Sequence, residues 1–231
     1  IMNFGEVKAI ICDSWKSFEI PIKKLKNKNL PLICLAHGNE LIIKNNSHHN
    51  RILNTLENVT KIVANSEFTK KLIKKVSPKL TNIEVIHPGV SSFENIIEEE
   101  VKLIEGSPTF LTLARLEKRK GHEFILQSIS KLINKYPNIR YIIAGEGEER
   151  SHLKSLVSSL NISKNVMFIG SINDNQKKFI LNKTDLMIMP TTDESNKLSI
   201  EGFGISYIEA ALFGIPSIAS SVGGSSEAVL H

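Results

Sequence analysis

Short apolar runs alternate with amphipathic stretches along the whole chain. Runs that are apolar on both faces are typical of strands in a parallel sheet that helices cover on both sides. We therefore predict strands at Ala9–Cys12, Leu32–Ala36, Lys61–Asn65, Glu84–Ile86, Phe110–Ala114, Arg140–Ala144, Asn165–Ile169, Leu186–Met189 and Ser217–Ala219.

The stretches between these runs carry helix signals. Apolar residues recur at helical spacing over His122–Tyr136, and Pro137 is expected to stop that helix. A similar stripe runs through Glu148–Leu160, and Ser66 is placed to cap a helix over Glu67–Val76. Strands and helices that alternate with short connections predict an α/β, doubly wound fold.

The chain divides near its middle. His87-Pro88-Gly89-Val90 reads as a hinge turn, and a fresh series of strands and helices begins at Phe110. We predict a partial N-terminal Rossmann-like domain over residues 1–88, a linker over 89–107 and a C-terminal Rossmann-like domain over 108–231. Both domains are expected to be incomplete, because no initiating Met opens the first and a helix is only beginning after Gly223-Gly224. We expect the chain to be part of a longer protein.

Composition narrows the class of protein. Of the 231 residues 41% are hydrophobic, and no apolar run approaches the roughly 18 residues of a membrane span. The first residues lack the pattern of a signal peptide, so the cytoplasm is the expected compartment. Cys12 and Cys34 both lie in apolar runs, which favours buried free thiols over a disulfide.

The basic balance of the chain suggests an anionic partner. A net charge of +5 and a pI near 9.1 suit nucleic acid, an anionic membrane or a phosphate-bearing substrate. No nucleic-acid-reading motif is present, and one Trp with three Tyr offers few stacking surfaces. Nucleic acid is therefore the least favoured of the three.

Two carboxylates bracket the start of an apolar helix near the end of the chain. Glu201 and Glu209 flank Gly202 and Gly204, whose backbone can approach a ligand closely. A helix N-terminus favours an anion. Glu201, which precedes the helix, could hold sugar hydroxyls, and Glu209, about one turn inside the helix, could hold the hydroxyls of a ribose. The alternative is a loop entering a helix with two solvent-exposed glutamates.

Three strand ends carry further candidates, at the edge where open α/β sheets bind ligands. Arg115 and Lys120 follow one strand and can converge on a diphosphate. Gly145 and Gly147 follow the next strand and could admit a nucleotide, although a tight turn would explain them equally well. His37 ends a strand of the first half, where an imidazole could bind a sugar hydroxyl or be purely structural.

The order of these motifs resembles a known family. HGNE, VIHPGV, ARLEKRKG, AGEGEE, EGFGISYIEA and GIPSIASSVGG occur in the order found in glycosyltransferase family 4, and the resemblance covers roughly residues 31–229. The sequence is most similar to bacterial mannosyltransferases of the phosphatidylinositol-mannoside type. The resemblance implies the GT-B fold of two Rossmann-like domains, and transfer of a hexose with retention of anomeric configuration. The Gly-rich loop that the family carries near its N-terminus is absent here.

The resemblance also implies roles for matching positions. Arg115 and Lys120 would bind the donor diphosphate, Glu201 the transferred sugar and Glu209 the nucleotide ribose, while His37 would lie near the donor sugar. We therefore expect four residues to be catalytic, namely His37, Arg115, Lys120 and Glu201. We expect six to bind the donor, namely Gly145, Gly147, Phe203, Gly204, Ile205 and Glu209.

No metal or other cofactor is expected. Asp13 and Asp185 are isolated in the sequence, and Asp193-Glu194 reads as a solvent-exposed loop, so no carboxylate pair suggests a bridging Mg²⁺. The charge on the departing diphosphate must then be met by cations and N–H dipoles.

The donor is expected to be a nucleotide sugar, with GDP-mannose ahead of UDP-glucose and UDP-N-acetylglucosamine. A lipid-linked or glycan acceptor in cell-envelope synthesis fits the resemblance. Lysine clusters at 23–28 and 70–79 could contact the inner membrane face, or form a solvated basic surface. A noncatalytic nucleotide-sugar-binding module and a sugar-nucleotide epimerase are the competing interpretations.

Overall fold

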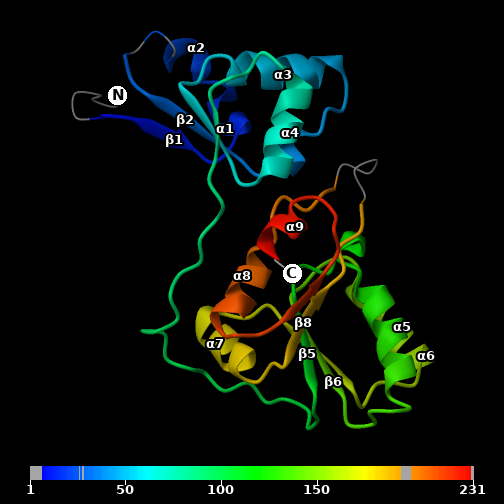
Figure 1. The fold of residues 1–231 in the computed structure, drawn as a ribbon. Helices are drawn as coiled ribbons and strands as arrows, with labels where there is room; N and C mark the ends of the chain where they lie inside the picture. The colour runs from blue at the N-terminus through cyan, green and yellow to red at the C-terminus, as the bar shows by residue number, and fades with distance from the viewer. Residues whose placement is uncertain (1–6, 26, 28, 194–198, 230–231) are drawn as a thin grey trace. The chain divides into compact units, whose positions relative to one another are not determined.

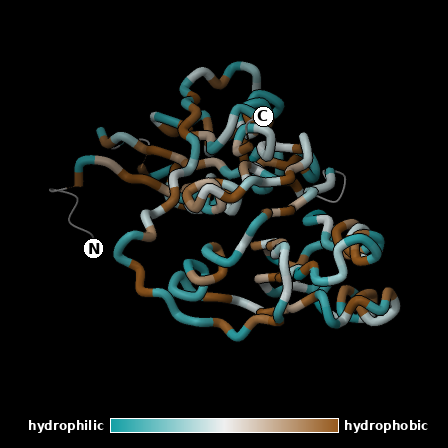
Figure 2. Tube along the Cα trace, turned by 60° about the horizontal axis from the view of Figure 1, so that its bottom comes forward, coloured by the Kyte–Doolittle hydropathy of each residue, from teal (hydrophilic) through white to brown (hydrophobic). Residues whose placement is uncertain are grey.

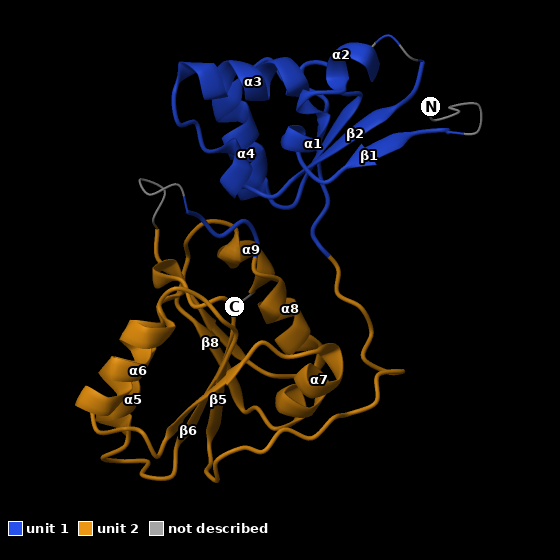
Figure 3. Ribbon diagram, turned by 180° about the vertical axis from the view of Figure 1, so that it is seen from behind, with its two compact units in different colours: residues 1–88, 194–203 blue, residues 89–193, 204–231 orange. Residues whose placement is uncertain are grey.

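The computed structural model describes residues 7–25, 27, 29–193 and 199–229. The chain forms two compact units, shown in different colours in Figure 3. The first contains Ile1–Pro88 and Glu194–Phe203, and the second contains Gly89–Asp193 and Gly204–His231. The chain therefore passes from one unit to the other at three points.

The first unit is built on a parallel sheet whose strands lie in sequence order. The strands are β1 (Ile10–Cys12), β2 (Leu32–Ala36), β3 (Lys61–Ala64) and β4 (Ile83–Val85). The helices are α1 (Trp15–Glu19), α2 (Ile22–Leu25), α3 (Asn46–Leu56) and α4 (Glu67–Val76), with a 3-10 turn η2 (Asn39–Leu41). Side chains such as Trp15, Phe18, Ile52, Ile62 and Ile73 form one buried core.

The second unit has a parallel sheet of strand order β7-β6-β5-β8-β9. The strands are β5 (Thr109–Leu113), β6 (Arg140–Ala144), β7 (Val166–Gly170), β8 (Leu186–Met189) and β9 (Ser217–Ala219). The helices are α5 (His122–Leu132), α6 (Arg150–Ser159), α7 (Asp174–Asn182), α8 (Ile205–Leu212) and α9 (Ser225–Ala228), with a 3-10 turn η3 (Lys118–Lys120). Helices α5 and α6 cover one face of the sheet, and α7 and α8 the other (Figure 1).

The helices on each face enclose a separate apolar core. Leu111, Met187 and Tyr207 belong to the core on the side of α7 and α8, whereas Ile129 and Ile143 belong to the core beneath α5 and α6. Strand residues thus contribute to the cores on both faces of the sheet, and hydrophobic segments, brown in Figure 2, alternate with hydrophilic ones along the chain. This confirms the prediction that the strands are apolar because both faces are covered.

The predicted elements are present with small shifts. Each predicted strand lies within one residue of its observed bounds at either end. Ser66 caps α4, because its Oγ accepts a hydrogen bond from Thr69 N at 3.0 Å. The helix predicted to reach Tyr136 ends at Leu132 and continues only as turns. Cys12 and Cys34 are free thiols, and no helix in the described ranges is long and apolar enough to cross a bilayer.

The segment 89–107 differs from the predicted linker. It has no helix or strand, but it groups with the second unit and packs along it. The Phe93 ring packs edge-on against Phe213 at a centroid distance of 5.2 Å. The Glu99 carboxylate accepts hydrogen bonds from Asn173 and Gln176 at the start of α7. The segment is thus a strap bound to α7, because its apolar and acidic side chains have partners there.

The strand order places a topological switch point at β5. The chain runs from β5 outward to β6 and β7, then returns to the other side of β5 with β8. Loops at the carboxyl ends of β5 and β8 therefore leave the sheet in opposite directions. This is the position where open α/β sheets bind ligands.

Two glycines lock the loops that follow β5 and β6. At Gly145, with φ +139°, a Cβ would lie 2.0 Å from the Ala114 carbonyl oxygen. At Gly147 a Cβ would lie 2.4 Å from the carbonyl oxygen of Leu116, whose N–H bonds the Glu146 carbonyl at 2.9 Å. Close approach of two protein backbones thus accounts for these glycines without a nucleotide. Their predicted donor-binding role stays a prediction.

A chain of buried polar groups lies beneath the loop after β5. The Thr112 hydroxyl and the Tyr141 hydroxyl are 2.8 Å apart, and His122 Nδ1 is 3.5 Å from the latter. His122 Nε2 lies 3.4 Å from the carbonyl oxygen of Arg115. Burial lowers the pKa of His122 to about 4; the Lys120 charge adds to that effect, and the contact with the Arg115 carbonyl opposes it.

We expect His122 to make the folded state acid-sensitive. The unfolded chain takes a proton at the His122 side chain near pH 6.5, whereas the folded chain takes it only near pH 4. The contribution of the neutral imidazole to the free energy of unfolding is therefore complete above pH 6.5 and decreases as the pH falls from 6.5 to 4. The full effect is about 3 kcal/mol. Urea unfolding at several pH values should show a shallower decline in His122→Gln, with His152→Gln, at an exposed position on α6, as the control. Equal slopes in all three proteins would contradict the assignment.

We expect Gly145→Ala to lower the free energy of unfolding by roughly 2–4 kcal/mol, because strain at positive φ and a backbone clash add. Gly214→Ala is the matched control, since Gly214 also has positive φ (+70°) but nothing within 4 Å of its Cβ position. It should cost about 1 kcal/mol from strain alone. Equal losses in urea unfolding would show that the contact with Ala114 contributes nothing.

Candidate active site

The loop after β5 carries two arginines on one carboxylate. Glu117 Oε1 is 2.7 Å from an Arg115 guanidinium nitrogen, and Glu117 Oε2 is 2.9 Å from Arg119 Nε. The Arg115 side chain is 69% exposed, whereas that of Arg119 is only 5% exposed. Glu117 thus links the exposed Arg115 side chain to the buried Arg119 side chain. A phosphate that bound here would compete with Glu117 for the Arg115 guanidinium.

Lys120 is turned into the switch point. It is 8% exposed, and its Nζ lies 3.5 Å from Met189 Sδ at the end of β8. The next residue, Gly121, has φ +72°, and a Cβ there would lie 2.3 Å from the Pro190 carbonyl oxygen. The Arg119 carbonyl accepts a hydrogen bond from Thr192 N at 2.7 Å. The loops after β5 and β8 are therefore joined around a buried lysine.

Helix α8 begins beside the same strand ends. Gly204 precedes its first residue, Ile205, with φ +102° and ψ +64°. A Cβ at Gly204 would lie 2.7 Å from the Tyr207 ring, and the Tyr207 hydroxyl donates to the Met189 carbonyl. Ser206 Oγ donates to the Leu113 carbonyl at 2.7 Å. These contacts fix the helix start against the ends of β5 and β8, so its N–H groups face the edge that carries Lys120.

Glu209 lies one turn inside α8 and has a cationic partner. Its Oε1 is 2.8 Å from Lys177 Nζ on α7, and its side chain is 13% exposed. It is therefore not the solvent-exposed glutamate of the alternative interpretation.

In the first unit, His37 pairs with an aspartate. His37 Nε2 is 2.9 Å from the Asp13 carbonyl oxygen and 3.1 Å from Asp13 Oδ1. Both residues follow neighbouring parallel strands, β2 and β1. Asp13, which has no carboxylate neighbour in the sequence, has His37 as its partner because strand pairing brings residues 24 positions apart to one edge. The pair orients an imidazole that remains 47% exposed.

The segment 199–203 is held by the first unit although it follows β8 in sequence. Asn39 Oδ1 accepts from Ile200 N at 2.7 Å, and Ser66 Oγ donates to the Gly202 carbonyl at 2.7 Å. A Cβ at Gly202 would lie 1.9 Å from the His37 carbonyl oxygen. Glu201, 9% exposed, is thereby fixed in the part of the chain that carries His37.

Phe203, the last residue of this segment, stacks on His87 with ring centroids 5.1 Å apart. The predicted residues thus fall into two groups. His37, Glu201 and Phe203 lie in the first unit, and the others lie in the second. The second group is Arg115, Lys120, Gly145, Gly147, Gly204, Ile205 and Glu209.

The sequence interpretation missed several partners of these residues. Glu117 and Arg119 lie within the ARLEKRKG motif but carried no signal of their own, because consecutive charges usually mark a solvated loop. Lys177 lies on a helix that gives no hint of contact with Glu209, 32 residues later. Only the strand order reveals that α7 and α8 share a face.

The aspartates do not form a metal site among the residues that the structure describes. No cluster of three or more His, Cys, Asp or Glu side chains suited to a metal occurs there. Asp185 Oδ2 accepts from Thr109 N at 2.7 Å, at the amino ends of β8 and β5, and so has a structural role. Of the Asp193-Glu194 pair, Glu194 lies outside the described residues.

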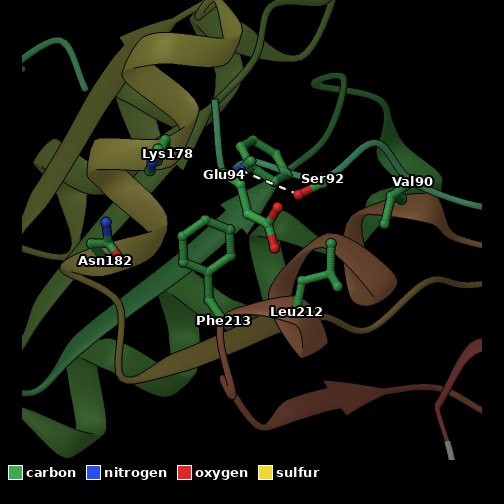
Figure 4. Close-up of a pocket in the computed structure, with 8 residues that line it drawn as sticks. Val90, Ser92, Glu94, Lys178, Asn182, Leu212 and Phe213 are labelled. Carbon is green, nitrogen blue, oxygen red and sulfur yellow. Dashed lines mark hydrogen bonds between the residues drawn. The ribbon is translucent and has the colours of Figure 1, made fainter. Parts of the chain in front are cut away.

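A cavity of about 380 Å³ lies elsewhere in the second unit (Figure 4). The strap, α7 and the end of α8 line it, with Ser92, Glu94, Lys178, Asn182 and Phe213 among its residues. Asn182 and Leu212 end helices that run back toward the amino ends of the strands. The cavity is therefore separate from the edge that holds Lys120.

Comparisons with known proteins agree with this arrangement. A family model described as "Glycosyl transferases group 1" matches residues 93–231. A protein of Methanocaldococcus jannaschii named as an uncharacterized glycosyltransferase is 23% identical over 249 residues, which cover 100% of this chain and 62% of that protein. The alpha-1,3/1,6-mannosyltransferase ALG2 of Mus musculus is 26% identical, over 98% of this chain and 60% of its own length.

A GDP-mannose-dependent alpha-(1-6)-phosphatidylinositol monomannoside mannosyltransferase of Mycolicibacterium smegmatis is 30% identical over 123 residues. That match covers 53% of this chain and 32% of the relative. These relatives confirm the resemblance inferred from the motifs.

Solved structures share the fold. HepE of Anabaena, in complex with UDP and glucose, has a TM-score of 0.75 at 19% identity, over 97% of this chain and 62% of that one. Sucrose-phosphate synthase of Thermosynechococcus elongatus also has a TM-score of 0.75 at 19% identity, over 95% and 57%. The fold is therefore that of GT-B glycosyltransferases. Because the family model covers more than half of the chain, the chain belongs to the group 1 glycosyl transferases.

Proposed function

We propose that this chain carries the donor site of a retaining, metal-independent glycosyltransferase that takes a hexose from a nucleotide sugar, with GDP-mannose as the preferred donor. The observation that carries the proposal is the buried Lys120 at the β5–β8 switch point, with Arg115 in the same loop. The start of α8 lies at the same strand ends. A diphosphate is the ligand whose charge suits this set.

The reaction needs a site that accepts charge. Cleavage of the bond between the anomeric carbon and the phosphate leaves negative charge on the departing nucleoside diphosphate. Lys120 meets that charge from a position already held by its own contact with Met189 and by the contact of Gly121 with Pro190, so little reorganisation is required. Arg115 adds a second cation once the phosphate replaces Glu117 as its partner.

Glu201 and His37 hold the transferred sugar in this proposal. Glu201 is fixed by the backbone contacts of Ile200 and Gly202, and the His37 imidazole is oriented by Asp13. The resemblance implies that the leaving phosphate takes the acceptor proton on the same face, so neither side chain serves as a dedicated base. The name of the Mycolicibacterium smegmatis relative supports GDP-mannose as the donor and a lipid-linked acceptor. The name of ALG2 supports mannose as the transferred sugar.

Peripheral binding to an anionic membrane is part of the proposal. Lys23 and Lys24 on α2, with Lys71 and Lys75 on α4, are exposed. Lys70 and Lys74 are less available, since Lys70 pairs with Glu67 and Lys74 donates to the carbonyls of Pro78 and Leu80. The exposed basic surface is thus smaller than the lysine content of the sequence suggests.

The donor site is tested by binding to the full-length protein. GDP-mannose, UDP-glucose and UDP-N-acetylglucosamine at about 100 times Kd should stabilise the fold by about 2.7 kcal/mol, which raises Tm by roughly 5–10 °C. GDP-mannose should act at the lowest concentration. Arg115→Ala and Lys120→Ala should each slow donor cleavage about 10²- to 10³-fold.

Lys118→Ala, an exposed lysine in the same loop, is the matched control and should leave the rate unchanged. Absence of any stabilisation by all three sugar nucleotides would overturn the proposal. Donor cleavage that chelation of divalent cations abolishes would overturn its metal-independent form.

Membrane binding is tested by co-sedimentation with vesicles. The full-length protein should sediment with vesicles rich in phosphatidylserine, less so at high salt, and not with neutral vesicles. Lys71→Glu/Lys75→Glu should weaken sedimentation several-fold, whereas Lys131→Glu/Lys135→Glu, an equal charge change on the second unit, should not. Sedimentation that depends on neither lipid charge nor salt would exclude this basic surface as a membrane-binding site.

A further inference from the structure

The carboxylate of Glu209 is held by a three-membered charge cluster. Lys177 Nζ lies 2.8 Å from Glu209 Oε1 and 3.0 Å from Asp174 Oδ1. The lysine side chain is 19% exposed and that of Glu209 is 13% exposed, whereas that of Asp174 is 67% exposed. The Lys177–Glu209 pair is therefore largely removed from solvent, where an ion pair is worth more than at the surface.

Lys177 has little freedom to leave this position. Its Nζ lies 5.9 Å from the centroid of the Phe93 ring, which contributes a cation–π contact. Burial alone would lower its pKa, but the hydrogen bonds to Glu209 and Asp174 outweigh that effect and raise it, so the side chain stays charged.

The helix that carries Lys177 is itself anchored. Asn173 and Gln176 form a capping box at the start of α7, and both donate to the Glu99 carboxylate of the strap. Lys178, on the next position, donates to the Ile96 carbonyl at 2.8 Å. Lys177 thus projects from a rigid support, as a residue that orients another must.

The hydrogen bond from Lys177 engages only one of the two oxygens of the Glu209 carboxylate. Lys177 occupies Oε1, and within the described residues no hydrogen bond to Oε2 is present. A carboxylate held by one oxygen can accept hydroxyl protons at the other in a fixed direction. Vicinal hydroxyl groups of a ribose are donors of the required kind.

We propose that Lys177 is a positioning residue, which fixes the Glu209 carboxylate to accept the ribose hydroxyls of the nucleotide and so makes the site select nucleotides that carry them. This inference rests on the proposed function. A pair that only packed α7 against α8 would stabilise the fold equally well, but it would not affect the discrimination between sugars.

The test measures that discrimination in the full-length protein. Isothermal titration gives Kd for GDP and for 2′,3′-dideoxy-GDP, and for the corresponding uridine pair. The wild type should bind the ribonucleotide much more tightly. Lys177→Met should weaken GDP binding about tenfold and leave the dideoxy analogue nearly unchanged, so the ratio of the two Kd values falls about tenfold.

Matched variants separate positioning from packing. Lys177→Arg, which keeps the charge, should restore most of the ratio, and Glu209→Gln should lower it with no further loss on addition of Lys177→Met. Lys183→Met removes an exposed lysine just after the end of α7, away from the contacts that anchor the helix start, and should leave the ratio at the wild-type value. Thermal unfolding of each variant reports any loss of the fold, and Lys177→Gln replaces Lys177→Met if that protein does not fold.

The outcomes distinguish the inference from the function on which it rests. A wild-type protein that binds neither GDP nor UDP would overturn both. A wild type that discriminates between the sugars, with Lys177→Met or Lys177→Gln discriminating equally well, would overturn the inference alone. A lower Tm with an unchanged ratio would show that the pair only joins the two helices.

Discussion

Backbone packing too tight for any side chain fixes the loop after β5, and the rest of the site depends on it. The carbonyl oxygens of Ala114 and Leu116 lie against Gly145 and Gly147, and that of Pro190 lies against Gly121. The loop is thus confined between the ends of β6 and β8. Only in that confinement is Lys120 directed toward β8 and buried rather than extended into water.

Much of the fold was predictable because strands covered on both faces must be apolar throughout. Strand bounds followed from this constraint, and the Ser66 cap followed from a hydroxyl ahead of a helical stripe. The strap 89–107 was not recognised, because Phe93 and Glu99 are single residues whose partners lie far along the chain. Neither periodicity nor composition signals a contact of that kind.

The candidate site was predictable only in the residues whose place follows from local sequence order. Arg115, Lys120 and Glu209 follow strand ends or begin a helix, so their positions could be inferred from local order. Asp13, Glu117 and Lys177, which orient them or His37, could not, since each contact depends on strand order or on side-chain packing. The glycines alone do not distinguish two roles, because contact between two loops and contact with a ligand leave the same signature in sequence.

The return of residues 199–203 to the first unit has a consequence for how such proteins can diverge. Asn39 and Ser66 form hydrogen bonds with the backbone of a segment that lies more than a hundred positions later in the sequence. A gene fusion that joined residues 1–88 of one family member to the remainder of another would place this segment against contact residues from a different protein. An exchange of the two halves between family members would therefore have to preserve the contacts of Asn39 and Ser66 with this segment.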